Sequence, residues 1–317
     1  MKRLLTLCLT LLAGLFAACS KGDKPTFRLI TGGEGGTYYA FGSVIAQHAT
    51  KNTPYRIVAL PGSGSQGNIM ALDDDLAELA FAQSDVLSYA YQGINTFART
   101  GKVDCFSVVA VLYPEQVQIV TLNPAIRTVD DLQGKVVSIG ASGSGVYFTA
   151  IDILDAYGLT EQDIRATYQS FGESVDALKD GKIDAAFIVA GIPTTAVADL
   201  AATQKIHLVD LDELHANILI ARSPYYIPYT INKETYGLER DGQTVAIGAA
   251  IIARDDLPDE VVHSLCADIF ENAPKLTAQH ARYKDVFPEY GASLQTVPYH
   301  TGAAKYFAEM GFLVQTK

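Results

Sequence analysis

The sequence is poor in the residues that bind metals and form disulfides. Only four of its 317 residues are cysteines, and two of these, Cys8 and Cys19, lie in the N-terminal segment. Cys105 and Cys266 remain for the body of the protein, as either two separate buried thiols or one disulfide. The six histidines show no H-E-x-x-H or paired ligand spacing. We therefore expect neither a metal site nor a bound cofactor.

Motifs of covalent catalysis are also absent. The segment Gly140-Ala141-Ser142-Gly143-Ser144 ends in serine where a G-x-S-x-G nucleophile elbow needs glycine. The adjacent carboxylates Asp73-Asp74-Asp75 would point in different directions around a helix and could not converge on one substrate. These absences predict that the protein is not an enzyme.

One motif supports an alternative, an NAD-binding enzyme. Gly62-Ser63-Gly64-Ser65-Gln66-Gly67 is a G-x-G-x-x-G segment after an expected strand, and Asp85 follows about 20 residues on, as in dinucleotide-binding domains. However, the motif follows the second expected strand instead of the first, and Pro61 interrupts that strand just before the motif. The sequence therefore favours this alternative least.

The one long hydrophobic run lies at the N-terminus. Lys2 and Arg3 precede an apolar run from Leu4 to Ala18. This run is shorter than the about 20 residues of a transmembrane helix, and it ends in small residues. We therefore expect residues 1–18 to be a signal peptide for export.

The residues after this run predict a lipid anchor. Phe16-Ala17-Ala18-Cys19 resembles a bacterial lipobox, so we expect cleavage before Cys19 and lipidation of its side chain. Residues 19–25 would then form a polar tether at the membrane surface, facing the periplasm. Ser20 after the cysteine resembles the outer-membrane pattern of a host with two membranes. Ordinary secretory cleavage is the alternative.

Positive charge is scarce in the exported chain. Loss of Lys2 and Arg3 reduces the 24 basic residues to 22 against 35 acidic ones, so the net charge changes from −11 to −13. Such a surface argues against a nucleic-acid partner.

The body of the sequence has the pattern of an α/β protein. Apolar β-branched runs alternate with segments of helical periodicity, as in a parallel sheet with crossover helices. One open sheet with so many strands would be unusually wide, which favours two sheets and hence two lobes. We expect lobe one to comprise residues 26–118 and 246–317, and lobe two residues 119–245. The two strands that cross between them would form the hinge.

Three Gly/Ser-rich loops are the strongest functional signal. They run from Thr31 to Tyr39, from Pro61 to Asn68 and from Gly140 to Tyr147, each between an expected strand and a helix. Glycine lets backbone N–H groups approach a ligand, and a helix start adds unpaired donors that suit a carboxylate or phosphate. For any single loop, a tight turn with serine as the N-cap is an alternative. Loops of both lobes can face one cleft.

These loops and the segments after them resemble a known family, the TAXI solute receptors that serve TRAP transporters. The resemblance rests on the first loop with Gly42, on Gly62-Ser63-Gly64-Ser65 with Asn68, and on Ala82-Gln83-Ser84-Asp85. It continues through Leu132 to Gly140, Ser142 to Gly145, Asp184 to Pro193 and Pro224-Tyr225-Tyr226, and so spans the body of the chain in order.

The resemblance implies an α/β, type II periplasmic-binding-protein-like clamshell of two lobes. The clamshell would close on a small carboxylate similar to glutamate or 2-oxoglutarate and deliver it to a TRAP-type membrane permease. The alternative is a ligand-sensing lipoprotein of the same fold that presents to a signalling partner. In either role we expect a monomer.

The candidate ligand-binding residues are donors at helix starts, aromatic walls of the cleft, and small or polar residues at strand ends. For each tyrosine, packing in the core is the alternative. The set comprises Tyr38, Tyr39, Ser63, Gly64, Ser65, Asn68, Gln83, Ser84, Asp85, Ser142, Ser144, Gly145, Tyr147, Ala190 and Gly191.

The three loops contain no lysine or arginine, although we expect them to bind an anion. Neutral donors would then complement the ligand's charge, unless Arg165, Lys182, Arg222 or Arg254 folds into the cleft. If none does, a zwitterionic or singly charged ligand fits the site better than a dicarboxylate.

Overall fold

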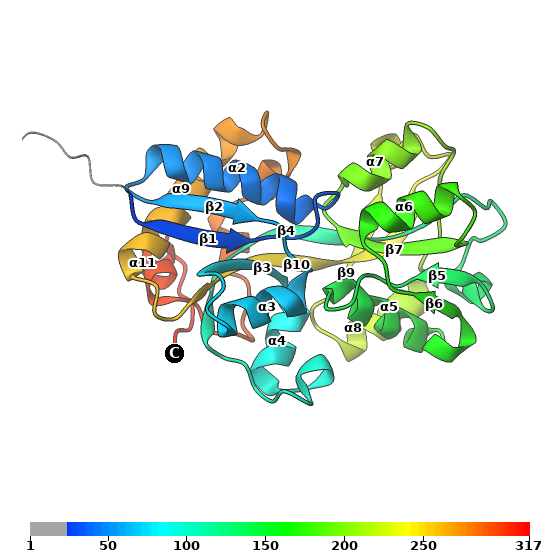
Figure 1. Cartoon of the computed structure of the whole chain (residues 1–317), viewed down its shortest axis with the longest axis horizontal. Coiled ribbons are helices and arrows are strands. Elements are labelled where there is room, and N and C mark those ends of the chain that lie inside the picture. Colours follow the sequence, from blue (N-terminus) through cyan, green and yellow to red (C-terminus); the bar gives the residue numbers. More distant parts are fainter. Residues whose placement is uncertain (1–23) are drawn as a thin grey trace, which may run out of the picture.

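Two long strands, β4 (Phe106–Thr121) and β10 (Gly242–Arg254), run through both halves of the molecule. The computed structural model describes residues 24–317, so the expected signal peptide and Cys19 lie outside the described residues. An α/β lobe lies at each end of the strand pair (Figure 1). No helix between residues 24 and 317 is long and apolar enough to cross a membrane.

Lobe one contains a five-stranded portion of the sheet in the order β2-β1-β3-β10-β4. Strands β1, β2 and β3 are parallel, and β10 runs antiparallel to β3 and β4. Helix α9 packs against α2 and α11. The bounds in this lobe are β1 Thr26–Ile30, α2 Thr37–Asn52, β2 Arg56–Leu60, α3 Ser65–Asp73, β3 Leu79–Gln83, α4 Ser84–Gln92, α9 Asp259–Leu276, α10 Pro288–Gly291 and α11 Thr301–Glu309.

Lobe two continues the same sheet in the order β4-β7-β5-β6. Strand β7 is antiparallel to β4 and parallel to β5, while two short strands, β8 and β9, pair with β4 and β10. The bounds are β5 Val136–Ser138, α5 Gly145–Ala156, β6 Arg165–Thr167, α6 Phe171–Lys179, β7 Ala185–Ala190, α7 Thr195–Ala201, β8 His207–Leu208, α8 Glu213–Arg222 and β9 Ile227–Ile231. Short 3-10 helices span Asn95–Phe97, Val129–Leu132, Glu161–Asp163, Lys233–Thr235 and Ala281–Asp285.

The expectation of two separate sheets is wrong. Strand β10 pairs with β4 from Ala246 opposite Gln116 to Arg254 opposite Phe106, so the strands belong to one 10-stranded sheet. The segments on either side of Pro114 and Glu115, which read as two apolar runs in the sequence, form the single strand β4. Pro114 and Glu115 hid this continuity because they interrupt the apolar run.

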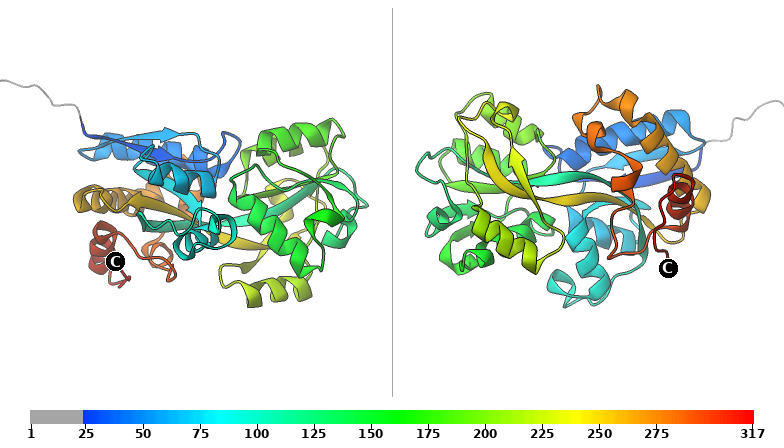
Figure 2. Two further views of the ribbon diagram at one scale, coloured as in Figure 1. Left: turned by 60° about the horizontal axis from the view of Figure 1, so that its bottom comes forward. Right: turned by 180° about the vertical axis from the view of Figure 1, so that it is seen from behind.

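The two lobes nevertheless have separate hydrophobic cores. The lobe-one core includes Tyr113 and Ala249, whereas a lobe-two core includes Val117 and Ile247. Between the cores the register of β4 and β10 is continuous, and it shifts only within lobe one, between Ala249 and Ala250 and between Ile251 and Ile252, where bulges bend the strands and increase their twist. Figure 2 shows the strand pair passing between the lobes from two further directions. The exact lobe boundaries at residues 118 and 246 stay a prediction.

Both cysteines of the body are free. Cys266 is buried in α9, where its thiol donates to the carbonyl oxygen of Val109 (3.8 Å), and Cys105 is partly exposed. The structure therefore has two separate thiols and no disulfide between them.

A buried asparagine fixes the turn between β2 and α3. The Asn68 amide donates to the carbonyl oxygens of Thr31 and Phe81, so it ties this turn to the end of β1 and to the middle of the neighbouring strand β3. Gly62 lies directly against it. A Cβ atom at position 62 would lie 2.3 Å from Asn68 Oδ1 and 2.6 Å from the Thr31 oxygen.

We predict that Gly62→Ala destabilises the protein by about 1–3 kcal/mol, the usual cost of overpacking a tight site. Gly33→Ala is the matched control, because a Cβ atom there would meet nothing within 4 Å. Thermal unfolding should show a lower melting temperature for the first variant alone. Equal melting temperatures would contradict the role of this close approach.

Candidate functional site

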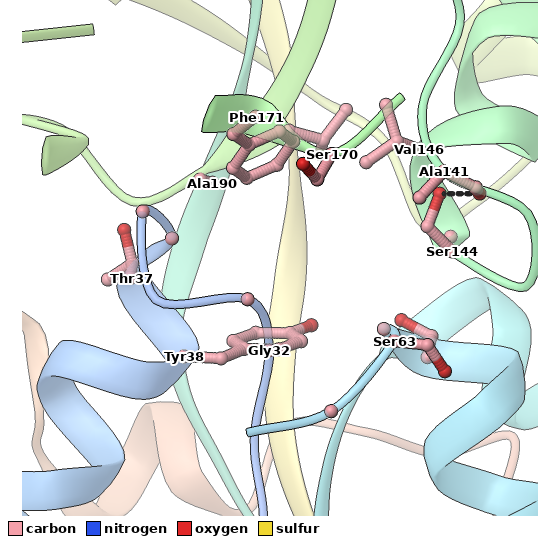
Figure 3. Close-up of a pocket in the computed structure, with 18 of the residues that line it drawn as sticks. Gly32, Thr37, Tyr38, Ser63, Ala141, Ser144, Val146, Ser170, Phe171 and Ala190 are labelled. Atoms are coloured by element: carbon pink, nitrogen blue, oxygen red, sulfur yellow. Dashed lines mark hydrogen bonds between the residues drawn. The ribbon is translucent and has the colours of Figure 1, made fainter. Parts of the chain in front are cut away.

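A cavity of about 490 Å³ lies between the lobes. Four strand-to-helix segments supply most of its lining: residues 32–38, residues 62–65, Ala141 with residues 144–146, and residues 169–172. Glu115 of the hinge and the strand-end residues Gln83, Val189 and Ala190 complete it. In Figure 3, Tyr38 and Ser63 lie on one side of the gap, and Ser144, Val146 and Phe171 lie on the other.

Four helices begin at this cavity, α2 and α3 from lobe one and α5 and α6 from lobe two. The N-cap residues of the first three, Gly36, Gly64 and Ser144, make no side-chain cap hydrogen bond, whereas Ser170 caps α6. Unpaired N–H groups and the positive end of the helix dipole favour an anion at such starts. The cavity therefore offers donors from both lobes to one ligand.

The lobes touch each other on two sides of the cavity. The N–H group of Gly67 donates to the carbonyl oxygen of Gly143 (3.1 Å). The hydroxyl of Thr37 donates to the carbonyl oxygen of Gly191 (2.8 Å). These contacts between lobes define a closed conformation.

The structure brings several of the candidate residues together. The candidates that line the cavity are Tyr38, Ser63, Gly64, Ser65, Gln83, Ser144, Gly145 and Ala190. All three Gly/Ser-rich loops contribute to this group, as their positions at strand ends require. Direct contact of these residues with a ligand stays a prediction.

Other candidates lie away from the cavity. Tyr39 is on a different face of α2 from Tyr38, because successive helical residues point about 100° apart. Asn68 serves the turn described above. Ser142 and Tyr147 line a separate outer depression, where the Tyr147 hydroxyl donates to Glu161 (3.0 Å).

The last candidates lie behind the cavity wall. Ser84 and Asp85 are buried in the first turn of α4, and neither lines the cavity. Gly191 contributes its carbonyl oxygen to the contact with Thr37 instead of lining the cavity. Because Asp85 is fully buried, its carboxylate cannot accept a hydrogen bond from the ribose of a dinucleotide. This finding removes the dinucleotide alternative.

A fourth loop, not predicted from the sequence, also lines the cavity. Residues 169–172 line the cavity between β6 and α6, and Phe171 forms part of its wall. The signal was present, because Ser170 and Glu173 form a capping box, the S-x-x-E signature of a helix start. The loop was overlooked because it contains only one glycine.

The cationic residues considered for the cleft are engaged elsewhere. Lys182 pairs with Asp180, Arg222 with Asp155, and Arg254 with Asp75 and Asp256, while Arg165 is exposed on β6. Every residue that lines the cavity belongs to the described part of the chain, and none is lysine or arginine.

A carboxyl group lies at the cavity instead. Glu115 is 2 % exposed, and its Oε2 accepts a hydrogen bond from the Tyr38 hydroxyl (2.8 Å). Burial raises the pKa of Glu115 to about 8. Glu115 could not be predicted from the sequence, because a lone glutamate inside an apolar strand belongs to no motif.

The sheet order and the two lobes define a fold class, the α/β clamshell of type II periplasmic binding proteins. The alkanesulfonate-binding protein SsuA from Xanthomonas axonopodis pv. citri has a TM-score of 0.50 at 15% identity, over 91% of this chain and 92% of its own. A putative L-cystine ABC transporter from Listeria monocytogenes has a TM-score of 0.50 at 14% identity, over 84% of this chain and 98% of its own. A structure described as a periplasmic transporter has a TM-score of 0.53 at 15% identity, over 91% of this chain and 93% of its own.

The sequence places the chain in a particular family within this class. The model of the NMT1-like family matches residues 29–311, and the chain belongs to that family. The expected two-lobed clamshell fold is thereby confirmed. At these identities, the solved structures establish the fold alone.

Asp85 makes the stability of the protein depend on pH. Its side chain is fully buried, Oδ1 accepts the Val86 N–H (2.7 Å), and Oδ2 has no partner in residues 24–317. Burial raises the pKa of Asp85 to about 8, and the nearby carboxyl group of Asp152 raises it further. The unfolded value is about 3.9. The folded state therefore binds the proton more tightly, and the free energy of unfolding falls as pH rises from about 4 to about 8.

We predict that Asp85→Asn reduces this loss of stability, since an amide cannot ionise. Thermal unfolding between pH 5 and pH 8 should show a shallower decline for the variant than for the unmodified protein. An exposed-site control, Asp74→Asn, should decline like the unmodified protein. Parallel curves for all three proteins would show that Asp85 does not titrate in this range.

Proposed function

We propose that this protein is the extracytoplasmic solute receptor of a TRAP-type secondary transporter, of the TAXI kind, and that it captures a small carboxylate between its lobes. The observation that carries the proposal is the convergence of uncapped helix starts from both lobes on one cavity between the lobes. Closure would complete the site only when a ligand satisfies donors from both sides.

We place the carboxylate of the ligand where α3 and α5 begin. Gly64 lies against Ser144, since a Cβ atom on Gly64 would be 3.0 Å from Ser144 Cα. The first N–H groups of α3 and α5, at Ser65 and Gly145, have no backbone partner within the described residues. Together with the Ser63 hydroxyl, they can hold one carboxylate through neutral donors.

The proposed receptor works outside the cytoplasm, held at a membrane through lipidated Cys19. The described chain begins at the outer end of lobe one, on the side away from lobe two (Figure 1). A tether attached there leaves the cleft and lobe two free to move. We propose that the partner is a membrane permease driven by an ion gradient, and that the receptor acts as a monomer.

A thermal-shift screen of the exported chain tests the ligand class. We expect amino acids or other small carboxylates to raise the melting temperature, and neutral sugars to leave it unchanged. A ligand at about 100 times its dissociation constant adds about 2.7 kcal/mol, which is a rise of several degrees. No response to any small carboxylate would contradict the proposal.

Gly145→Ala tests closure. A Cβ atom there would lie 1.5 Å from Gln83 Oε1 and 2.9 Å from Ser65 Oγ, both on the opposite lobe. Because these groups must move apart, we expect a loss of ligand affinity of about tenfold or more. The control Gly172→Ala also lies at the cavity, yet its Cβ would meet nothing within 4 Å. Titration calorimetry should separate the two, and equal affinities would place the binding contacts elsewhere.

The role in transport needs its own measurement. In proteoliposomes with the TRAP-type permease, uptake of the identified ligand should require this receptor and an ion gradient, and should proceed without ATP. Tight binding without receptor-dependent uptake would contradict the transport role and favour a sensing role.

A further inference from the structure

Glu115 occupies an unusual place for a charged residue. It lies on β4 in the hinge region, where it is paired with Ile247 of β10. The side chain is almost completely buried, and it lines the cavity that we propose as the ligand site. Among the lining residues of the described chain, the other carboxylate is Glu34, which is exposed.

One oxygen of Glu115 is fixed and the other is available. Oε2 accepts the hydrogen bond from Tyr38, whose ring is stacked on Phe81 with centroids 4.9 Å apart. Oε1 makes no hydrogen bond with any residue from 24 to 317, yet it is not among the fully enclosed, unpartnered atoms of that part of the chain. The carboxyl group therefore presents Oε1 to the cavity in a fixed orientation.

The groups around Glu115 do not neutralise a negative charge. Tyr38 of α2, Tyr113 of β4 and Tyr290 of α10 are its phenolic neighbours, and Asp85 of α4 is an acidic one. Buried Arg282 lies near Tyr113, but its guanidinium is paired with Asp285 (3.0 Å). Burial and the nearby Asp85 together raise the pKa of Glu115 to about 8. Without a ligand, the carboxyl group of Glu115 therefore carries a proton at neutral pH.

The rest of the cavity is suited to a single carboxylate. At the end formed by α3 and α5, the lining is neutral and rich in donors. At the end formed by α2 and α6, Glu173 caps α6 and Glu34 lines the cavity, so two carboxylates there oppose a second anion. The walls between the ends are apolar, with Val146, Phe171, Val189 and Ala190.

We propose that Glu115 determines the specificity of the cleft by receiving a protonated amine, so that the ligand is a zwitterion with one carboxylate and an apolar body. On binding, the O–H bond of Glu115 breaks, its proton passes to solvent, and the carboxylate pairs with the ligand's ammonium group. Ligand binding therefore releases one proton. The inference rests on the proposed function, because it assumes that the cleft holds a carboxylate.

Matched ligands test this inference on the exported chain. L-leucine and 4-methyl-2-oxopentanoate share an apolar body and one carboxylate, and only leucine carries an amine; glutarate carries a second carboxylate. Titration calorimetry at pH 6 to 9, in buffers of different ionisation enthalpy, gives affinity and proton exchange together. We expect leucine to bind most tightly, to release about one proton below pH 8, and to gain about tenfold in affinity per pH unit there.

Variants identify Glu115 as the titrating group. Glu115→Gln should weaken leucine binding roughly tenfold to a hundredfold and remove its pH dependence, while binding of the oxoacid is retained. Tyr38→Phe removes a hydrogen bond that lowers the pKa of Glu115, so the pH at which leucine affinity levels off should move upward. The second variant keeps the test decisive if the first does not fold.

Two outcomes would overturn the inference. Tighter binding of the oxoacid or of glutarate, with proton uptake, would show that Glu115 acts as a hydrogen-bond donor to an anion; the receptor function would stand. Unchanged pH dependence in Glu115→Gln would assign the released proton to another group. Failure of every carboxylate to bind would instead contradict the proposed function itself.

Discussion

The hydrogen-bonded pair of strands β4 and β10 is the constraint on which the rest of the structure depends. The ladder between them passes from one hydrophobic core into the other without interruption. The lobes therefore cannot separate freely, and a change in their relative orientation must bend or twist this strand pair between the two cores. Every cavity-lining loop lies at the end of a strand in the same sheet, so this sheet brings four helix starts to one place.

The sequence predicted the parts of the site that depend on local chemistry. The three Gly/Ser-rich loops were identified because glycine and serine mark strand-to-helix turns, and all three reach the cavity. The continuity of the sheet was not predicted, because strand pairing is a long-range property and Pro114 interrupts the pattern. Glu115 escaped for the same reason, since its burial is decided by residues far away in the chain.

Basic side chains do not supply the donors of the proposed site. The acidic residues outnumber the basic ones, and the basic residues considered for the cleft form ion pairs elsewhere or are exposed. In the proposed function the cavity binds its ligand through backbone N–H groups, whose direction is set by the helices that contain them. Such donors need no flexible cationic side chain, and their orientation is fixed before the ligand arrives.

The connection of the lobes through one pair of strands, β4 and β10, has a consequence for any partner protein. A ligand held between helix starts of both lobes fixes one angle between two rigid bodies, and the outer surfaces of the lobes turn with it. A partner that contacts both lobes would then bind only one relative orientation of the lobes. It would distinguish filled from empty receptors without touching the ligand. The ligand's chemistry and the partner's recognition surface could thus change independently of each other.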